Sequence, residues 1–367
     1  MLMYVFCHLS YGPAKAQNRV GETVDTILGR SLKAIGNGIG GVRTIVRGFD
    51  YLDTTYIEPQ HYLFTVMLQG SYIYDRYWLY GQEQSMTFMP EGDFRLGPYF
   101  GWKWAFAGYT FSLNHDNFNK KKTEIALSLY SSQIGVDLFY RRTGSDYKLR
   151  GAYFGDEARF RSMDGVSFDG VKAGITGVSL YYIFNHGRFS YPAAFSQSTV
   201  QKRSCGSWLA GLGYTRNTLE LDYNKLQNLL DVHMAPHHVQ LDSTLMFNNM
   251  QYHDFYVSCG YAYNWVFAPQ WLFCASGQLA LGYKKSTGQA YTKGSSGFSF
   301  DNFSPNMLGR FGLVYNNMRW YAGMSFIVHS NNYRESHFWT NNTFGSMNMY
   351  VGYNFVLKKK YRKNRSL

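Results

Sequence analysis

The sequence predicts an all-β fold: a transmembrane, antiparallel, up-and-down β-barrel of about twelve strands with a short N-terminal amphipathic helix. Three observations predict it. Apolar residues alternate with small or polar ones, aromatic residues make up 19% of the chain, and tight connections alternate with long ones. Successive side chains of a strand point to opposite faces, so this alternation gives each strand one apolar face. In a membrane barrel that face contacts lipid.

The run 254–263 shows the alternation best. One face carries large residues and the other small ones apart from Tyr256; the first set is Phe255, Val257, Cys259, Tyr261 and Tyr263, and the second is Tyr256, Ser258, Gly260 and Ala262. The same register turns Cys259 outward, whereas Cys205 and Cys274 point inward. Because Cys259 can reach neither of the other two, we expect no structural disulfide.

The 367 residues contain no Pro- or Ser-rich linker, so we expect one folded domain after the N-terminal region. The first residues are apolar and end in Ala14-Lys15-Ala16, which resembles the end of a secretory signal. The predicted division is a signal peptide remnant at 1–16, a periplasmic segment at 17–60, the barrel at 61–357 and a basic periplasmic tail at 358–367. Within the N-terminal segment, 22–35 has apolar residues at helical spacing and predicts the amphipathic helix.

Twelve strands are expected in the barrel, at 62–72, 85–101, 103–113, 123–131, 133–142, 171–184, 204–222, 250–266, 271–283, 305–316, 318–329 and 342–357. Long connections are expected at 73–84, 114–122, 143–170, 223–249, 284–303 and 330–341. Tight ones are expected near Trp102, at Ser132, at 267–270 and at Asn317. Outer-membrane barrels pair short periplasmic turns with long outer loops, and an even strand count returns both termini to the periplasm.

The last strand, 342–357, alternates in the same way and carries Phe355 near its end. It is similar to the C-terminal strand that the barrel-insertion machinery recognises, which predicts that machinery as a partner during biogenesis. The net charge of +12 owes six positive charges to 358–365, a run that follows this strand. We interpret this run as a solvated tail or a contact with anionic lipid headgroups, and not as a nucleic-acid site.

On the register that turns apolar residues outward, six charged side chains point into the lumen together with Tyr99, Tyr130, Gly135 and Gly312. The lumen-lining candidates are Arg95, Glu124, Asp137, Arg141, Arg310 and Arg319. Charges are tolerated there because water or each other can solvate them, whereas Arg or Lys on the lipid face would cost about 2–4 kcal/mol at mid-depth. These charges either line a narrow path or close it as an ion-paired plug.

One connection on the periplasmic side is long where the others are tight. It spans 185–203, and its candidate residues are Arg188, Tyr191, Gln197, Lys202 and Arg203. It either folds back into the lumen, where its basic residues could meet Glu124 or Asp137 and form an anion-favouring constriction, or packs beneath the barrel against 22–35. A third reading is an ordered turn that stabilises the rim.

Four stretches, 53–59, 97–102, 128–144 and 189–198, resemble a known family. They read DTTYIEP, GPYFGW, SLYSSQIGVDLFYRRTG and FSYPAAFSQS. The chain is similar over most of 53–357 to uncharacterised outer-membrane β-barrels of Bacteroides-type bacteria, classed as a domain of unknown function. The resemblance implies a barrel located in the outer membrane and offers no activity to carry over.

Enzymatic readings are weaker. His329, Ser330 and His337 are the residue types of a hydrolase, but adjacent strand positions face opposite ways. His233, His237 and His238 with Asp231 could ligate zinc, although we expect no metal and no cofactor. The leading function is a narrow channel for small solutes, anions among them. The alternative is a structural or partner-binding component of an envelope complex. An outer-membrane lipid-modifying enzyme ranks third.

Overall fold

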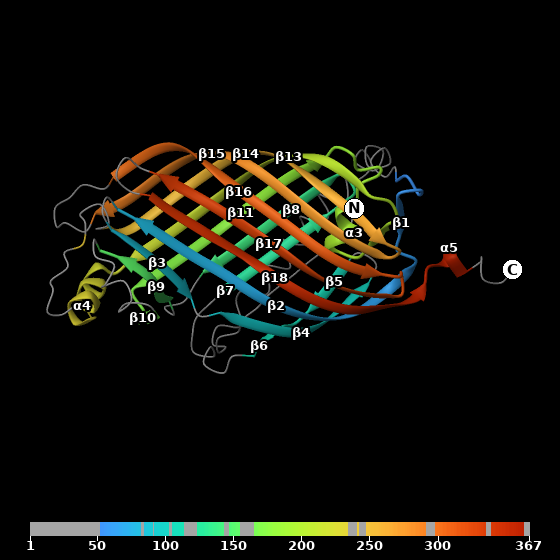
Figure 1. Ribbon diagram of the computed structural model, residues 1–367, viewed down its shortest axis with the longest axis horizontal. Helices are drawn as coiled ribbons and strands as arrows, with labels where there is room; N and C mark the ends of the chain where they lie inside the picture. Colours follow the sequence, from blue (N-terminus) through green and yellow to red (C-terminus); the bar gives the residue numbers. More distant parts are fainter. Residues whose placement is uncertain are drawn as a thin grey trace, which may run out of the picture.

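The computed structural model describes residues 52–81, 84–90, 92–102, 105–113, 123–142, 147–154, 165–233, 241, 247–290, 298–334 and 339–362. Its dominant feature is one antiparallel sheet of sixteen strands, rolled into an elongated barrel-shaped wall (Figure 1). No helix in the described ranges has the length and apolar character needed to cross a membrane.

The strands of the large sheet are β2 (62–80), β3 (85–90), β4 (93–102), β5 (105–108), β6 (111–112), β7 (123–130), β8 (134–142), β9 (147–153), β10 (166–168), β11 (171–183), β13 (205–221), β14 (247–268), β15 (271–290), β16 (298–316), β17 (320–334) and β18 (339–357). A separate two-stranded sheet pairs β1 (57–59) with β12 (199–201). The helices are α3 (191–195), α4 (223–233) and α5 (359–362).

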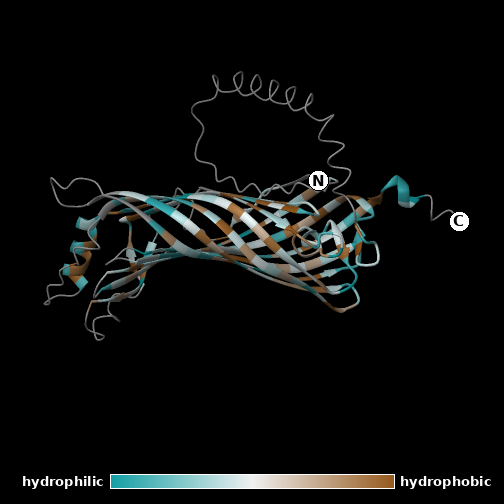
Figure 2. Ribbon diagram, turned by 90° about the horizontal axis from the view of Figure 1, so that it is seen from above, coloured by the Kyte–Doolittle hydropathy of each residue, from teal (hydrophilic) through white to brown (hydrophobic). Residues whose placement is uncertain are grey.

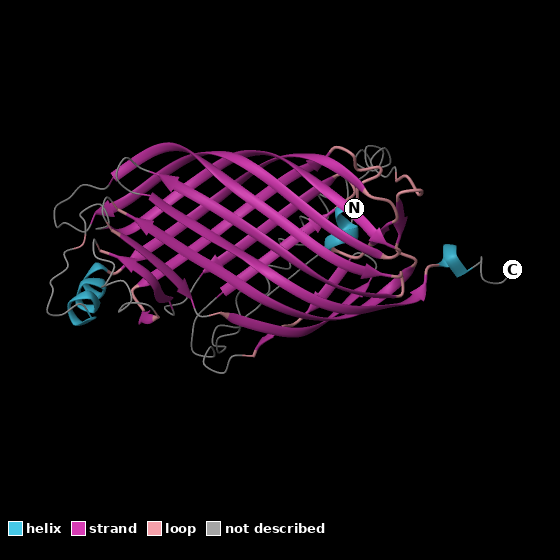
Figure 3. Cartoon of the chain, in the orientation of Figure 1, coloured by secondary structure: helices cyan, strands magenta, loops and turns pink. Residues whose placement is uncertain are grey.

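Neighbours in the sheet follow the chain from β13 to β18, and β18 then pairs with β2, the first strand of the wall. This confirms the predicted antiparallel pairing, and the up-and-down order holds from β13 through β18 to β2 and β4. The tight turns are also where the sequence places them, for example at Pro269 and Gln270 between β14 and β15. Gln270 has a positive φ of 69°, which lets two residues reverse the chain. We call the end with these turns and α5 the turn end, and the opposite one the α4 end (Figure 3).

The strand ends differ from the prediction at the α4 end. β2 continues to Tyr80, β15 to Ala290 and β16 starts at Phe298, so the expected loops 73–84 and 284–303 are much shorter. The expected loop 143–170 contains β9 and β10, and 223–249 contains α4. The predicted strand 85–101 is two strands, β3 and β4, because the chain leaves the ladder around Pro90 and Gly92; the predicted strand 103–113 is likewise divided into β5 and β6.

Closure of the wall is not seen in the described residues. The sheet ends at β7 on one side and, through β4, at β5 and β6 on the other, and no ladder joins these two sides. The wall nevertheless curves fully enough for β8 and β16, five places apart in the sheet, to meet through Arg310 and Asp137. The predicted N-terminal helix at 22–35 lies outside the described residues.

Exposed apolar side chains form a band that begins near the tight turns and ends at a row of aromatic residues. Near the turns the band has Trp102, Phe184, Trp208, Trp265 and Trp320, each at least half exposed. Aliphatic residues such as Leu212 and Leu279 follow, at 60% and 70% exposure. The row at the far edge consists of Tyr140, Tyr214, Phe255, Tyr283 and Phe303. We call this stretch of the wall the apolar-faced part.

Beyond that row, toward α4, the faces exchange roles, and we call this stretch the polar-faced part. On β14, Asn249 points outward while Met250 and Tyr252 are buried inside. The interior is one apolar cluster that includes Leu79, Phe88, Leu149, Phe168, Leu219, Leu226, Leu230 and Tyr333. Figure 2 shows hydrophobic residues recurring along the strands of the wall, and α4 carrying both kinds. The polar-faced part is therefore packed like a soluble domain.

Candidate lumenal site

Residues 185–203 fold back from the turn end into the lumen, which is the first of the two placements that the sequence left open. α3 is buried along Tyr191–Ala194, and the Ser190 hydroxyl accepts a hydrogen bond from the Ala193 amide at 3.3 Å. Pro192 in the first turn presets the helical backbone. The Tyr191 hydroxyl meets Ser276 Oγ of β15 at 2.5 Å. A short, capped helix thus occupies the lumen at the turn end.

A close fit to the wall holds this segment. A Cβ added to Gly312 of β16 would lie 3.3 Å from the Ala194 carbonyl oxygen, so a side chain there would require α3 to shift by a few tenths of an ångström. Gln197 donates from Nε2 to the Tyr350 hydroxyl at 2.8 Å and accepts from Asn316 at 3.2 Å. With the apolar residues around Tyr191, these contacts form a packed plug at the turn end.

The basic residues of the connection do not face the lumen, which corrects the idea of a basic constriction. The Arg188 guanidinium lies 3.5 Å from the Asp53 carboxylate, and Lys202 Nζ donates to the Thr54 carbonyl at 2.9 Å. Arg188 and Arg203 also lie over the ring of Tyr56, at 5.2 and 5.8 Å. These three side chains hold residues 53–56 in place, next to the pairing of β1 with β12. The side of the plug that faces the lumen is occupied by α3 instead.

Asp53 is the anionic partner in this arrangement. Hydrogen bonds from Thr55, with Arg188 and Arg203 nearby, hold the pKa of the Asp53 carboxyl below its usual range. Its charge is therefore retained at neutral pH and lost only in strong acid.

Arg310 and Asp137 form an ion pair that crosses the lumen from β16 to β8. Asp137 also accepts a hydrogen bond from Ser128 Oγ at 2.7 Å, and the Arg310 guanidinium lies 4.7 Å from the ring centre of Tyr181. That ring packs over Gly135, where an added Cβ would come within 2.1 Å of it. An arginine that is 1% exposed is tolerable only with such partners.

The other charged candidates have local partners or different surroundings. Arg95 pairs with Asp93 at 2.7 Å, and Arg141 lies 3.9 Å from Asp75. Glu124 lies on β7, paired in register with Arg141, but its side chain lies outside the described residues. Arg319 does not line the lumen: it occupies the turn between β16 and β17, is exposed, and donates to the Tyr353 hydroxyl at 2.6 Å. The sequence register fails there because a turn breaks the alternation.

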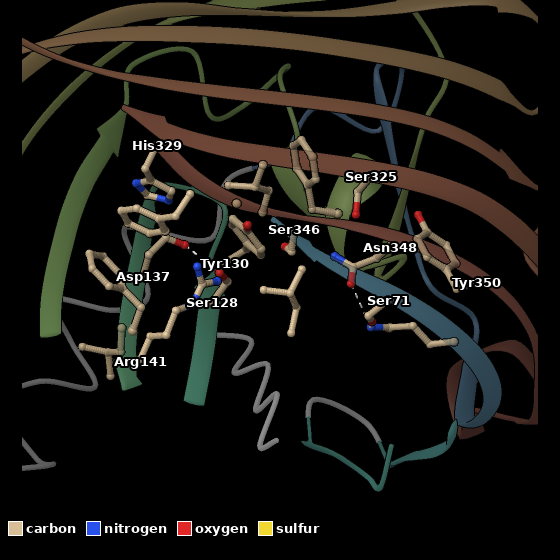
Figure 4. Close-up of a pocket in the computed structure, with 18 of the residues that line it drawn as sticks. Ser71, Ser128, Tyr130, Asp137, Arg141, Ser325, His329, Ser346, Asn348 and Tyr350 are labelled. Atoms are coloured by element: carbon tan, nitrogen blue, oxygen red, sulfur yellow. Dashed lines mark hydrogen bonds between the residues drawn. The ribbon is translucent and has the colours of Figure 1, made fainter. Parts of the chain in front are cut away.

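A cavity of about 130 Å³ remains between the plug and the apolar cluster of the polar-faced part (Figure 4). Its polar wall includes Ser71, Ser128, Asp137, Arg141, Ser325, His329, Ser346 and Asn348. His329 stacks on Phe344 at 4.8 Å, whereas Ser330 bonds to Asn341, so the two residues of the suggested hydrolase lie apart. His233 ends α4, while His237, His238 and His337 lie outside the described residues, within which no cluster of metal-binding side chains occurs.

A second buried ion pair was missed by sequence reasoning. Asp254 and Lys284 face each other in the ladder of β14 and β15, are fully buried, and approach within 3.4 Å. Asn306 bridges them, donating to Asp254 at 2.6 Å and accepting from Lys284 at 3.0 Å. Asp254 precedes the outward Phe255, and Lys284 follows the outward Tyr283. Alternation therefore places both charges on the inner face, and this was the sequence signal that could have predicted the pair.

Comparison with known families gives one match. A family described as a domain of unknown function (DUF4421) matches residues 51–355. This covers nearly the whole stretch in which the sequence resemblance was noted and confirms its class; the bacterial group stays a prediction. No curated protein matches the chain.

Three solved structures of similar shape show low sequence identity to this chain. The outer membrane protease OmpT of Escherichia coli aligns with a TM-score of 0.37 and 5% identity over 80% of this chain and 97% of its own. The translocator domain of the autotransporter NalP of Neisseria meningitidis gives 0.29 and 12% over 90% and 99%. Ail of Yersinia pestis gives 0.22 and 8% over 78% and 99%. Such scores give no basis for transferring a function.

Proposed function

We propose, from the premise that the chain belongs to the DUF4421 family, a domain of unknown function, that it is an outer-membrane β-barrel with a closed lumen. Its role is then that of a structural or partner-binding component of the cell envelope. The observation that carries this proposal is that packed side chains occupy the lumen at both of its ends. The segment 185–203 packs one end, the apolar cluster packs the other, and the Arg310–Asp137 pair crosses between them.

The membrane position rests on the apolar-faced part. Burying its exposed aromatic and aliphatic side chains in lipid removes the cost of contact between apolar surface and water. The tight turns then face the periplasm, and the α4 end projects outward. We include outer-membrane lipids among the partners. We also include the barrel-insertion machinery, because β18 has the alternating pattern of a C-terminal barrel strand, with Phe355 near its end.

Partner binding would use the two ends that leave the membrane. At the turn end, Arg188, Lys202 and Arg203 contact residues 53–56 and hold this segment against the barrel base. At the α4 end, the polar-faced part offers a rigid outer surface because its interior is packed. An envelope protein is the expected partner.

Single-channel recording in planar bilayers tests the closed lumen. The wild type should give no steady conductance, and Tyr191→Ala with Phe195→Ala should create one, since these rings fill the turn end. The matched variant replaces Arg188, Lys202 and Arg203 with Gln and should stay closed, because these side chains contact residues 53–56. Steady wild-type currents would refute a closed lumen; fractionation with the outer membrane and heat-modifiable migration test the location independently.

A narrow channel for small solutes, anions among them, is the second candidate. The observation that favours it is the polar wall of the cavity between the two packed ends, which includes Arg141 and His329. It requires the plug to leave the lumen, and gated wild-type currents that the Tyr191→Ala and Phe195→Ala variant makes permanent would support it.

A further inference from the structure

A shallow groove of about 350 Å³ lies on the outward surface of β8, β11 and β13, just beyond the aromatic row that ends the apolar-faced part. Its floor is Gly174, where an added Cβ would lie 2.7 Å from Thr218 Oγ1. Arg142, Lys172 and Arg216 surround it. The absence of a side chain at the floor therefore creates a recess bordered by cations.

The recess carries a net positive charge. Arg142 and Arg216 are exposed, and the Lys172 ammonium is 3.9 Å from the Glu220 carboxylate, with side chains 64% and 50% exposed. An exposed pair at that distance is a weak interaction, so Lys172 can turn toward another anion at little cost. Three cations and one carboxylate leave about two positive charges over the glycine floor.

Arg216 is held in place by its neighbours on β14. Its Nη2 donates to Gln251 Oε1 at 3.2 Å, and Gln251 in turn contacts His253 Nε2 at 2.8 Å. His253 Nδ1 meets the Tyr214 hydroxyl at 2.7 Å. This chain of hydrogen bonds links the Tyr214 hydroxyl to the Arg216 guanidinium. Because the Arg216 side chain is already ordered, binding a ligand costs it less conformational entropy.

Below Thr176, which belongs to the groove lining, the same strands present mainly apolar side chains to the outside, toward the turns. Tyr140 and Tyr214 follow Arg142 and Arg216 on the same face. Four aliphatic residues continue the surface: Leu138, Val178, Leu180 and Leu212, at 38%, 38%, 39% and 60% exposure. A ligand with an anionic head and hydrocarbon chains would satisfy both surfaces at once.

We propose that this groove binds the phosphate group of an outer-leaflet lipid, whose acyl chains lie along the aliphatic surface below. The proposal rests on the proposed membrane position. Arginine favours phosphate because its planar donors match the phosphate oxygens. Gly174 lets the phosphate approach the strand, and Lys172 exchanges Glu220 for the lipid anion.

Native mass spectrometry of the full chain in nonionic detergent micelles tests this. The micelles contain either dioleoyl phosphatidic acid or dioleoylglycerol, which differ only in the phosphate. The wild type should retain one phosphatidic acid per chain. It should retain at least about tenfold less dioleoylglycerol, because only the phosphate can interact with the three neighbouring cations. Arg142→Gln with Lys172→Gln and Arg216→Gln should lose that preference; Arg216→Gln alone should lose part of it.

The matched control replaces Lys359, Lys360 and Arg362 with Gln, which removes the same charge at the turn end and should retain the lipid. Equal loss in the control and the groove variant would overturn the proposal, as would equal retention of dioleoylglycerol or no retained lipid. Release of the lipid by millimolar inorganic phosphate would show a free-phosphate site instead. Because lipid retention does not depend on conductance, an open lumen would leave this result unaffected.

Discussion

Long strands such as β14 and β15 run through both the apolar-faced and the polar-faced part, yet the inner and outer faces of the two parts are opposite in character. Along β14, Val257 is 65% exposed on the outside of the apolar-faced part, where Asn264 and Asp254 are buried inside. A few residues earlier, in the polar-faced part, Met250 is buried and Asn249 is exposed. The change occurs between Phe255 and His253 without any break in the ladder.

The difference shows that strand geometry and hydrophobic pattern are independent. Backbone hydrogen bonds continue through the aromatic row. In the proposed membrane position, the surroundings of the outer face change there from lipid to water. A polar interior needs explicit partners for each charge, whereas an apolar interior needs only close packing. The two parts should therefore respond differently to substitution.

The largest effect is expected inside the apolar-faced part. Arg310→Gln leaves Asp137 buried without its cation and should cost about 3–5 kcal/mol of unfolding free energy. Urea unfolding in phospholipid vesicles measures it, with the exposed Arg150→Gln as the control. The double variant Arg310→Gln with Asp137→Asn should recover part of the loss. A loss below about 1 kcal/mol in the single variant would mean that the pair is solvated.

The next effect concerns the interior of the polar-faced part. Leu79 is fully buried in the apolar cluster, so Leu79→Ala should cost about 3 kcal/mol through lost burial and the cavity left behind. Thr287→Ala, on the outer surface of the same part, should be close to neutral. If the two variants unfold at the same urea concentration, the cluster is not a packed core.

A pair of lysine substitutions on the outward face of β14 locates the boundary itself. Val257→Lys should cost about 2–4 kcal/mol in vesicles because the charge enters lipid. Asn249→Lys, eight residues away on the same face and exposed, should change stability by no more than about 0.5 kcal/mol. Equal costs would place both positions in one solvent and remove the boundary at Phe255.

The smallest effect is expected at the base of the barrel. Asp53→Asn removes the anion that holds Arg188, so trypsin should cleave after Arg188 and Arg203 a few times faster at pH 7, as mass spectrometry can follow. The wild type should lose this contact only as pH falls through the lowered pKa of Asp53, below 3.8, because a depressed carboxyl pKa stabilises at higher pH. Unchanged cleavage rates in the variant would show that the contacts of Tyr56 and the pairing of β1 protect Arg188 and Arg203 without Asp53.

Much of the wall could be predicted from the sequence. Strand starts such as Tyr62, the turn at Pro269 and Gln270, and the outward Cys259 follow from alternation and turn chemistry, which are local. The predicted strands stop short at the α4 end because apolar residues on the outer face end there while the strands continue. From Phe255 toward the α4 end, β14 continues with polar residues outside and apolar residues inside. The apolar outer face therefore ends at Phe255, although the backbone pairing continues.

The candidate site depended on contacts that alternation does not encode. The sequence determined that Arg310 and Asp137 face inward, because Phe311 follows Arg310 and Val136 and Leu138 flank Asp137 on the outward face. Only the tertiary structure decided that they meet, that α3 enters the lumen and that Arg188 turns to Asp53. Strand tilt and the curvature of the whole sheet set which inner positions oppose one another, and these are properties of all the strands together.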